Sequence, residues 1–116
     1  VESTRHAKEH VEKLLGIKDI FDNPKPVNLI SHLIEITRMK KDALILDFFA
    51  GSGTTYQAVL ELNKKDGGKR KCILVQKAEE PLEKNPLGTI ADITWQRMIK
   101  NAEQFGLQKP LKIIFE

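Results

Sequence analysis

Apolar residues follow two spacings along the chain, which predict helices in some segments and strands in others. Helical spacing, with apolar side chains three and four positions apart, runs from Ser3 to Leu15, from Pro26 to Thr37, from Thr55 to Asn63 and from Thr89 to Phe105. Short continuous apolar runs occupy residues 43–49, 72–76 and 111–115. Runs of this length and composition are typical of strands buried on both faces.

Capping and breaking residues set the expected ends of these elements. Ser3 or Thr4 is suited to cap the first helix, and Gly16 to stop it. Two prolines in the segment Pro24-Lys25-Pro26 exclude regular helix or central strand there. We expect Pro26 to occupy the first turn of the second helix.

The order of the expected elements is helix, helix, strand, helix, strand, helix, strand. Strands that alternate with helices form parallel sheets, since each crossover helix returns the chain to the same end of the sheet. The sequence therefore predicts an α/β fold of the doubly wound kind.

Composition narrows the class of protein. The chain has 116 residues, of which 41% are apolar and 30% are charged, as in a single globular domain. There is no apolar window of about 18 residues and no apolar leader, so we expect no membrane span or secretory signal and a cytoplasmic setting. The one cysteine, Cys72, is expected to be an inert core residue. The chain begins at Val1, which suggests a piece of a longer product.

The net charge is +3, and its basic residues gather in one turn. Residues 64–71 contain five basic residues, one acidic residue and the pair Gly67-Gly68. A contact with phosphate is one interpretation of this turn. A solvated loop is the favoured interpretation, because one basic turn is weak evidence for a nucleic-acid site.

A glycine-containing turn follows the first predicted strand and carries most of the functional information. It reads Asp47-Phe48-Phe49-Ala50-Gly51-Ser52-Gly53-Thr54-Thr55 and opens a helix at the carboxyl end of the strand, where α/β sheets bind ligands. A P-loop requires a lysine after the second glycine, and that place holds Thr54. A dinucleotide fingerprint requires a third glycine where Tyr56 stands. A nucleoside triphosphate and NAD are therefore unfavoured.

The whole string resembles the S-adenosylmethionine loop of DNA amino-methyltransferases. The preceding segment Phe21-Asp22-Asn23-Pro24-Lys25-Pro26 resembles the motif that lies before this loop in the β class of those enzymes. Residues 71–76 and 89–93 resemble the C-terminal part of the modification (Mod) subunit of type III restriction–modification systems. The resemblance covers residues 21 to about 100. It implies a Rossmann-like methyltransferase fold over residues 21–116, preceded by an amphipathic helix in residues 1–20.

The resemblance also implies roles for individual residues. Asp47 would hold the methionine amino group of S-adenosylmethionine, directly or through water, and Thr54 would lie near its carboxylate. The side of the pocket opposite the glycine turn would be closed by Asn23, Lys25 and Pro26. The remaining cofactor contacts would come from Phe48, Phe49, Ala50, Gly51, Ser52 and Gly53. Asp47 as a mere helix cap and Lys25 as a solvated lysine are the alternatives.

Gln76 departs from the usual methyltransferase pattern. Many of these enzymes have an acidic residue after the second strand, where it binds the ribose hydroxyls. A glutamine accepts and donates hydrogen bonds there without the strength of a charge. Glu79 is an alternative a few residues further on. The type III resemblance favours Gln76 as the cofactor residue.

The catalytic motif of the family, of the Asp-Pro-Pro-Tyr type, is absent from the sequence. In the β class this motif and the target-recognition domain precede the cofactor motifs, so we expect them upstream of Val1. The resemblance implies adenine-N6 methylation of double-stranded DNA by the full enzyme. Implied partners are the N-terminal catalytic and recognition portion and a restriction subunit. A non-catalytic remnant or assembly module of a split gene is the alternative.

The first predicted strand would pair on one side with the strand ending at Gln76, and its other side would normally pair with the strand that carries the catalytic motif. That edge is expected to be open here, which predicts marginal stability or self-association, for instance as a homodimer. His6 and His10 share one helix face, but no third ligand accompanies them, so a metal site is not expected. Trp95 is interpreted as a packing residue rather than a base-stacking one.

Overall fold

The computed structural model describes residues 3–18, 20–21, 24–77 and 87–107. These residues form four helices and two strands, which alternate after the first two helices. In chain order they are α1 (Thr4–Leu15), α2 (Val27–Ile36), β1 (Leu44–Asp47), α3 (Thr54–Asp66), β2 (Lys71–Leu74) and α4 (Ile90–Gln104). The strand predicted at residues 111–115 lies outside the described residues.

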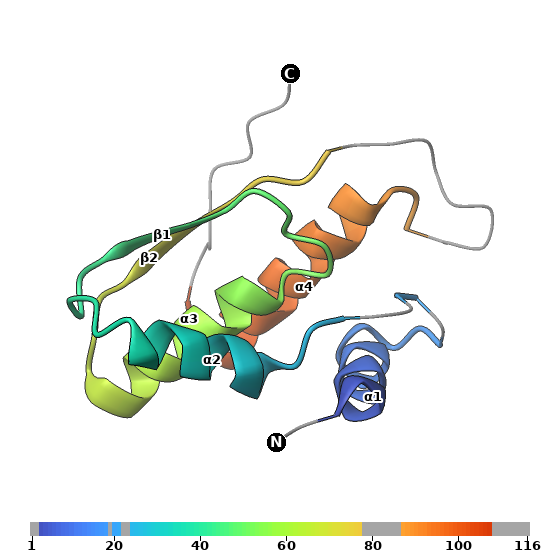
Figure 1. Ribbon diagram of the computed structural model, residues 1–116. Coiled ribbons are helices and arrows are strands. Elements are labelled where there is room, and N and C mark those ends of the chain that lie inside the picture. Colours follow the sequence, from blue (N-terminus) through green and yellow to red (C-terminus); the bar gives the residue numbers. More distant parts are fainter. Residues whose placement is uncertain (1–2, 19, 22–23, 78–86, 108–116) are drawn as a thin grey trace.

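The two strands pair in parallel, as the alternation predicted, and Leu44 stands opposite Lys71 at the start of the register. The helices lie on one side of this small sheet (Figure 1). Helix α3 is central, because it packs against α2, α4 and β2, while α1 packs against α4. The described part is thus a mixed α/β structure, consistent with a partial methyltransferase fold.

The core lies between the inner face of the sheet and the helices. Ile45, Cys72 and Leu74 face inward from the strands and pack against α3, whose residues from Thr54 to Leu60 are all buried. Burial raises the pKa of the Cys72 thiol to about 12, and the charge of Asp47 acts in the same direction. The thiol is therefore protonated at neutral pH and unreactive, as expected of a core cysteine.

Helix ends follow the predicted caps with one correction. Ser3 caps α1 by accepting a hydrogen bond from the backbone N–H of His6, and Gly16 ends this helix in a left-handed conformation. Pro26 is the N-cap of α2 rather than a member of its first turn. Its ψ of 135° is extended, so helical geometry starts one residue later, at Val27.

The outer face of the sheet corrects the expectation that both strands are buried on both faces. Leu44 is 62% exposed and Leu46 is 49% exposed, and Ile73 of β2 is similarly open. The side chains of a strand alternate between two faces, and the described helices cover only one of them. Within the described residues β1 has a strand neighbour on one side only, so self-association stays a prediction.

Helix α2 ends in an unusual way. Thr37 is its C-cap, and the next residue, Arg38, has a φ of +52°. Glycine is the residue that usually adopts this left-handed conformation after a helix, and an L side chain there costs about 1–2 kcal/mol. The chain therefore keeps an arginine at a place where glycine would be better accommodated.

An ion pair closes the end of α3. The Arg70 guanidinium lies 2.7 Å from Asp66 and is almost buried, whereas the Asp66 side chain is about one quarter exposed. The hydrogen bond from Arg70 is the largest cause that lowers the pKa of Asp66 from 3.8 to about 2. Because the folded state binds this proton less tightly than the unfolded state, the pair stabilises the fold above pH 3.8.

This stabilisation is expected to disappear as the pH falls from 3.8 through 2. Thermal unfolding of the wild type and of Asp66→Asn, followed by circular dichroism across that window, would measure it. The difference in melting temperature should be largest near neutral pH and should shrink toward pH 2. A difference that stays constant over the window would contradict the assignment.

Candidate functional site

The glycine turn occupies the carboxyl edge of the sheet, between β1 and α3, where the sequence placed it (Figure 1). Gly51 and Gly53 have φ values of +56° and +86°. A Cβ atom on Gly53 would lie 3.5 Å from the Thr94 carbonyl oxygen, and one on Gly51 would lie 3.5 Å from the Phe21 ring. The two glycines thus meet a conformational need, and the turn is packed against both α4 and the segment before α2.

Asp47, the last residue of β1, holds the start of this turn. One carboxylate oxygen accepts the backbone N–H of Phe49 at 2.9 Å, and the other accepts the Thr55 hydroxyl at 2.6 Å. Asp47 does not cap α3, because the N-cap is Gly53 and has no side-chain cap bond. A carboxylate has about four acceptor positions, so Asp47 keeps capacity for a further donor such as an ammonium group.

Gln76 is joined to the glycine turn by a hydrogen bond. Its side-chain carbonyl accepts the backbone N–H of Gly51 at 2.8 Å, across 25 positions of sequence. The carbonyl of Gly51 accepts a short hydrogen bond from the Thr94 hydroxyl of α4. Gly51 is therefore fixed on both sides by side chains from other elements. The alternative residue, Glu79, lies outside the described residues.

Arg97 of α4 is the residue that sequence reasoning missed. It is 1% exposed, and one of its terminal nitrogens donates to the hydroxyls of Ser52 at 2.8 Å and Thr54 at 3.0 Å. The other terminal nitrogen donates to the Gln57 side-chain carbonyl at 2.9 Å. One guanidinium thus ties the glycine turn and the first turn of α3 to α4.

This network extends to α1. Because the Gln57 carbonyl is committed to Arg97, its buried NH₂ group is directed toward α1 and meets the His10 Nε2 atom at 2.9 Å. His10 is therefore an acceptor at Nε2. This histidine anchors α1 to α3, and no cluster of three or more metal-ligating residues occurs in the described part of the chain.

The segment before α2 meets the glycine turn through its backbone. Pro24 and Pro26 are buried, and the Lys25 carbonyl accepts the Thr54 hydroxyl at 2.9 Å. The Lys25 side chain is exposed, and Asn23 lies outside the described residues. The hydroxyls of Ser52 and Thr54 accept from Arg97 and both residues are buried, so neither side chain is offered to a ligand.

A groove of about 330 Å³ adjoins the turn, between α2 and the end of β1. Asp47, Phe48 and Phe49 form one end of it, and apolar side chains of α2 form its wall. Phe49 is 90% exposed, and Phe48 is 63% exposed. Ala50 is buried below them, and Trp95 is half-buried on α4. The aromatic rings thus border the edge at which the partly exposed Asp47 lies.

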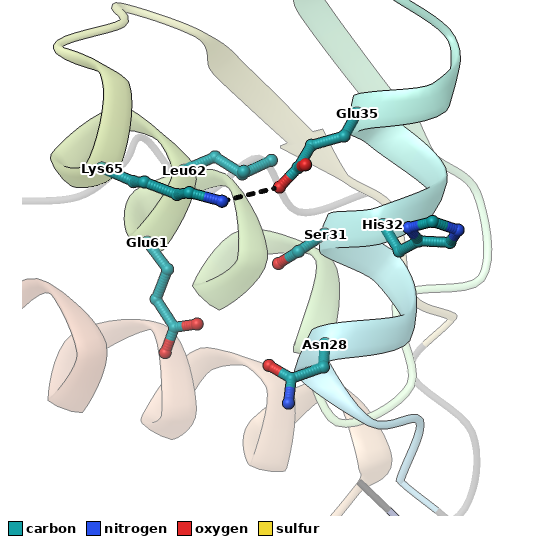
Figure 2. Close-up of a pocket in the computed structure, with 7 residues that line it drawn as sticks. All are labelled: Asn28, Ser31, His32, Glu35, Glu61, Leu62 and Lys65. Carbon is teal, nitrogen blue, oxygen red and sulfur yellow. Dashed lines mark hydrogen bonds and ion pairs between the residues drawn. The ribbon is translucent and has the colours of Figure 1, made fainter. Parts of the chain in front are cut away.

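Figure 2 shows a second hollow, of about 230 Å³, between α2 and α3. Its lining includes Asn28, Ser31 and Glu61, and none of its residues belongs to the glycine turn. The Lys65 ammonium lies 3.4 Å from the Glu35 carboxylate and links the two helices across it. This hollow is lined mostly by polar residues of α2 and α3, and it is separate from the carboxyl edge of the sheet.

No helix among the described residues combines the length and apolar character that a bilayer crossing requires. The apolar face of α2, the most apolar helix, extends over only ten residues.

Comparison with known proteins identifies the family. The chain is 54% identical over 77 residues to the EcoPI Mod subunit of a type III restriction–modification enzyme from Escherichia phage P1. The aligned region covers 66% of this chain and 12% of that protein. It is 42% identical over 116 residues to the type II methyltransferase M.KpnI of Klebsiella pneumoniae. This second aligned region covers 95% of this chain and 27% of that protein.

A third relative is the StyLTI Mod subunit of Salmonella typhimurium, 36% identical over 116 residues, which covers 95% of this chain and 17% of that protein. The chain thus spans between about one eighth and one quarter of the length of these relatives. The sequence model described as DNA methylase matches residues 2–87, which include the glycine turn and Gln76. On this match over most of its length, the chain belongs to the DNA methylase family.

Proposed function

We propose that this chain is the S-adenosylmethionine-binding part of a DNA methyltransferase that acts on adenine N6, of the kind found in type III Mod subunits. The observation that carries the proposal is the carboxyl edge of the sheet, where Asp47 holds the start of the glycine turn and Gln76 binds Gly51 within it. Membership of the DNA methylase family supports it.

The residues of this edge fit the cofactor. The Asp47 carboxylate would receive the methionine ammonium, a charge-assisted contact that its unused acceptor positions allow. The backbone N–H groups at the start of α3 have no side-chain cap and would favour the methionine carboxylate. The exposed rings of Phe48 and Phe49 would border the adenine end. When bound, the cofactor supplies an electrophilic methyl group.

Gln76 is assigned to the ribose. Its carbonyl already accepts from Gly51, and among the described residues its amide nitrogen makes only a long contact of 3.4 Å to the Lys77 carbonyl. That nitrogen is therefore available as a donor to a ribose hydroxyl. Asn23, Lys25 and Pro26 would close the pocket on the opposite side, as proposed from the sequence.

We expect Gln76→Glu to tighten binding of S-adenosylmethionine about fivefold, roughly 1 kcal/mol, because a carboxylate still accepts from Gly51 and adds a charged acceptor for the ribose hydroxyls. Calorimetric titration of the two proteins measures the change. Gln76→Ala is the matched control and should weaken binding, since it removes both contacts. Equal affinity of the glutamate and alanine variants would contradict the ribose assignment.

The proposal itself is tested by calorimetric titration of the folded chain with S-adenosylmethionine, with ATP and NAD as control ligands. Binding of S-adenosylmethionine alone is the expected result, because the turn has neither the P-loop lysine nor the third glycine. Absence of binding by a chain that is folded by circular dichroism would favour the non-catalytic remnant or assembly module instead.

The isolated chain is not expected to methylate DNA. Its sequence has no Pro-Pro-aromatic motif to accept the hydrogen bonds of the adenine amine and stack on a flipped base. Methyl transfer would then require the catalytic and recognition portion of a larger enzyme, and a restriction subunit is a further proposed partner. Transfer of labelled methyl groups to duplex DNA by the 116-residue chain would contradict this proposal.

A further inference from the structure

Two turns that are distant in the sequence meet at the amino ends of the strands, opposite the glycine turn (Figure 1). One turn links α2 to β1, and the other links α3 to β2. The backbone N–H of Lys69 donates to the Lys41 carbonyl at 2.7 Å, and the Lys41 ammonium donates to the Asp66 carbonyl at 3.1 Å. The turns are therefore held together by one bond between backbone groups and one from the Lys41 side chain to the backbone.

These turns concentrate positive charge. Residues 38–42 and 64–71 together contain eight basic and two acidic residues, a net charge of +6, whereas the whole chain has +3. The pairing of the turns thus gathers at one end of the sheet more positive charge than the whole molecule carries. Five exposed basic side chains on or beside the paired turns form what we call the basic end: Arg38, Lys40, Lys41, Lys69 and Lys71.

Two of the nearby acids are already engaged elsewhere, and a third, Asp42, lies exposed on the turn between α2 and β1. Asp66 pairs with Arg70 at 2.7 Å, and Glu35 of α2 pairs with Lys65 at 3.4 Å. Within the described part of the chain, no side chain of the basic end forms an ion pair. Like charges gathered on paired turns repel one another where they lie within a Debye length, which is about 8 Å in physiological salt. An anionic partner would relieve that repulsion.

Arg38 gives independent support. It adopts a left-handed conformation that glycine adopts without strain, so its side chain is kept at a conformational cost. Strain of this kind is typical of positions where a side chain serves a function. Arg38 and Lys40 then lie on the turn that contacts Lys69 through Lys41.

We propose that the basic end binds the phosphate backbone of double-stranded DNA without reading its sequence. Flexible exposed lysines act as point charges suited to phosphate, and they would position the duplex rather than select a base. The choice of DNA as the anion rests on the proposed function. From Leu44 to Asp47 the strand runs about 10 Å at 3.3 Å per residue, so the phosphates contacted here would lie away from the glycine turn, at the other end of the sheet.

The test uses fluorescence anisotropy of a labelled duplex of about 20 base pairs with the full 116-residue chain, over about 50 to 200 mM salt. The patch variant combines Lys40→Gln, Lys69→Gln and Lys71→Gln. The matched control combines Lys13→Gln, Lys18→Gln and Lys100→Gln, exposed lysines of other surfaces. Both variants lose the same three charges, so any difference between them reports position.

The patch variant is expected to bind the duplex about tenfold or more weakly and to lower the slope of log affinity against log salt by about 3. The control variant should keep a slope within about 1 of the wild type. Equal loss in both variants, or no binding by the wild type, would overturn the proposal. Tighter binding of poly-glutamate than of duplex at the same salt would also overturn it, in favour of an acidic protein partner.

Titration of the patch variant with S-adenosylmethionine separates this proposal from the proposed function. Its cofactor affinity should match that of the wild type, because the basic end and the glycine turn lie at opposite ends of the sheet. Loss of duplex binding with intact cofactor binding supports both proposals. Duplex binding that depends on the basic end in a chain that fails to bind cofactor would overturn the cofactor assignment alone.

Discussion

Replacement of Asp47 by asparagine is expected to weaken binding of S-adenosylmethionine by about 10- to 150-fold, or roughly 1.5 to 3 kcal/mol. The physical reason is the loss of a charge-assisted hydrogen bond to the methionine ammonium. Asparagine has nearly the same shape and can still accept the Phe49 N–H, which Asp47 accepts at 2.9 Å. The turn should therefore keep its conformation while the charge is removed.

The Asp47 experiment has two controls. Asp47→Ala should lose cofactor binding and also destabilise the turn, because it removes the acceptors of both Phe49 and Thr55. Thr55→Val removes the 2.6 Å contact to the carboxylate while leaving its charge, so its affinity should fall only a few-fold. Calorimetric titration gives the affinities, and circular dichroism reports folding. An Asp47→Asn variant that binds like the wild type would refute the assigned role.

Arg97→Ala is expected to lower the free energy of unfolding by about 2 to 4 kcal/mol. The substitution leaves the Ser52, Thr54 and Gln57 acceptors without their buried donor and opens a cavity beside α3. Small domains have only about 5 to 15 kcal/mol of stability, so this is a large share. Urea denaturation followed by circular dichroism measures the loss.

Conservative variants separate the contributions of Arg97. Arg97→Met keeps most of the volume but no donors, and Arg97→Lys keeps the charge but loses the planar fork, so we expect intermediate losses with lysine the smaller. Arg5→Ala is the exposed control, because Arg5 pairs with Glu9 on the surface of α1 and should change stability by less than about 0.5 kcal/mol. An Arg97→Ala variant as stable as Arg5→Ala would show that the network contributes little.

The expected elements agree with the structure wherever local chemistry decides them. The periodicity predicted all four helices, with differences of a few residues at their ends, and the alternation of elements predicted the parallel pairing of β1 and β2. The Ser3 cap and the Gly16 stop follow from side-chain and backbone preferences within one turn. The burial expected on both faces of the strands was wrong, because burial depends on what covers a face.

The contacts of the candidate site also divide into those that local sequence predicted and those that depend on the tertiary structure. Thr94, Arg97 and Asn101 are polar residues at helical spacing beside the apolar face of α4, and this stripe was the available signal. A polar stripe is equally typical of a solvent-exposed face, so periodicity could not distinguish a buried network from a wet surface. Asn101 is fully buried, and its side-chain amide has no hydrogen-bond partner in the part of the chain that the structure describes, which nothing in the sequence indicated.

The sequence by itself determined the elements, the glycine turn at the carboxyl end of β1 and the Asp47 that precedes it, because these depend on residues a few positions apart. Only the tertiary structure decided that Gln76 reaches Gly51 across 25 positions and that Arg97 reaches Ser52 across 45. It also decided that the turns around Lys41 and Lys69 meet. Contacts of this kind depend on how helices pack against a sheet, and local periodicity and propensity carry no information about that packing.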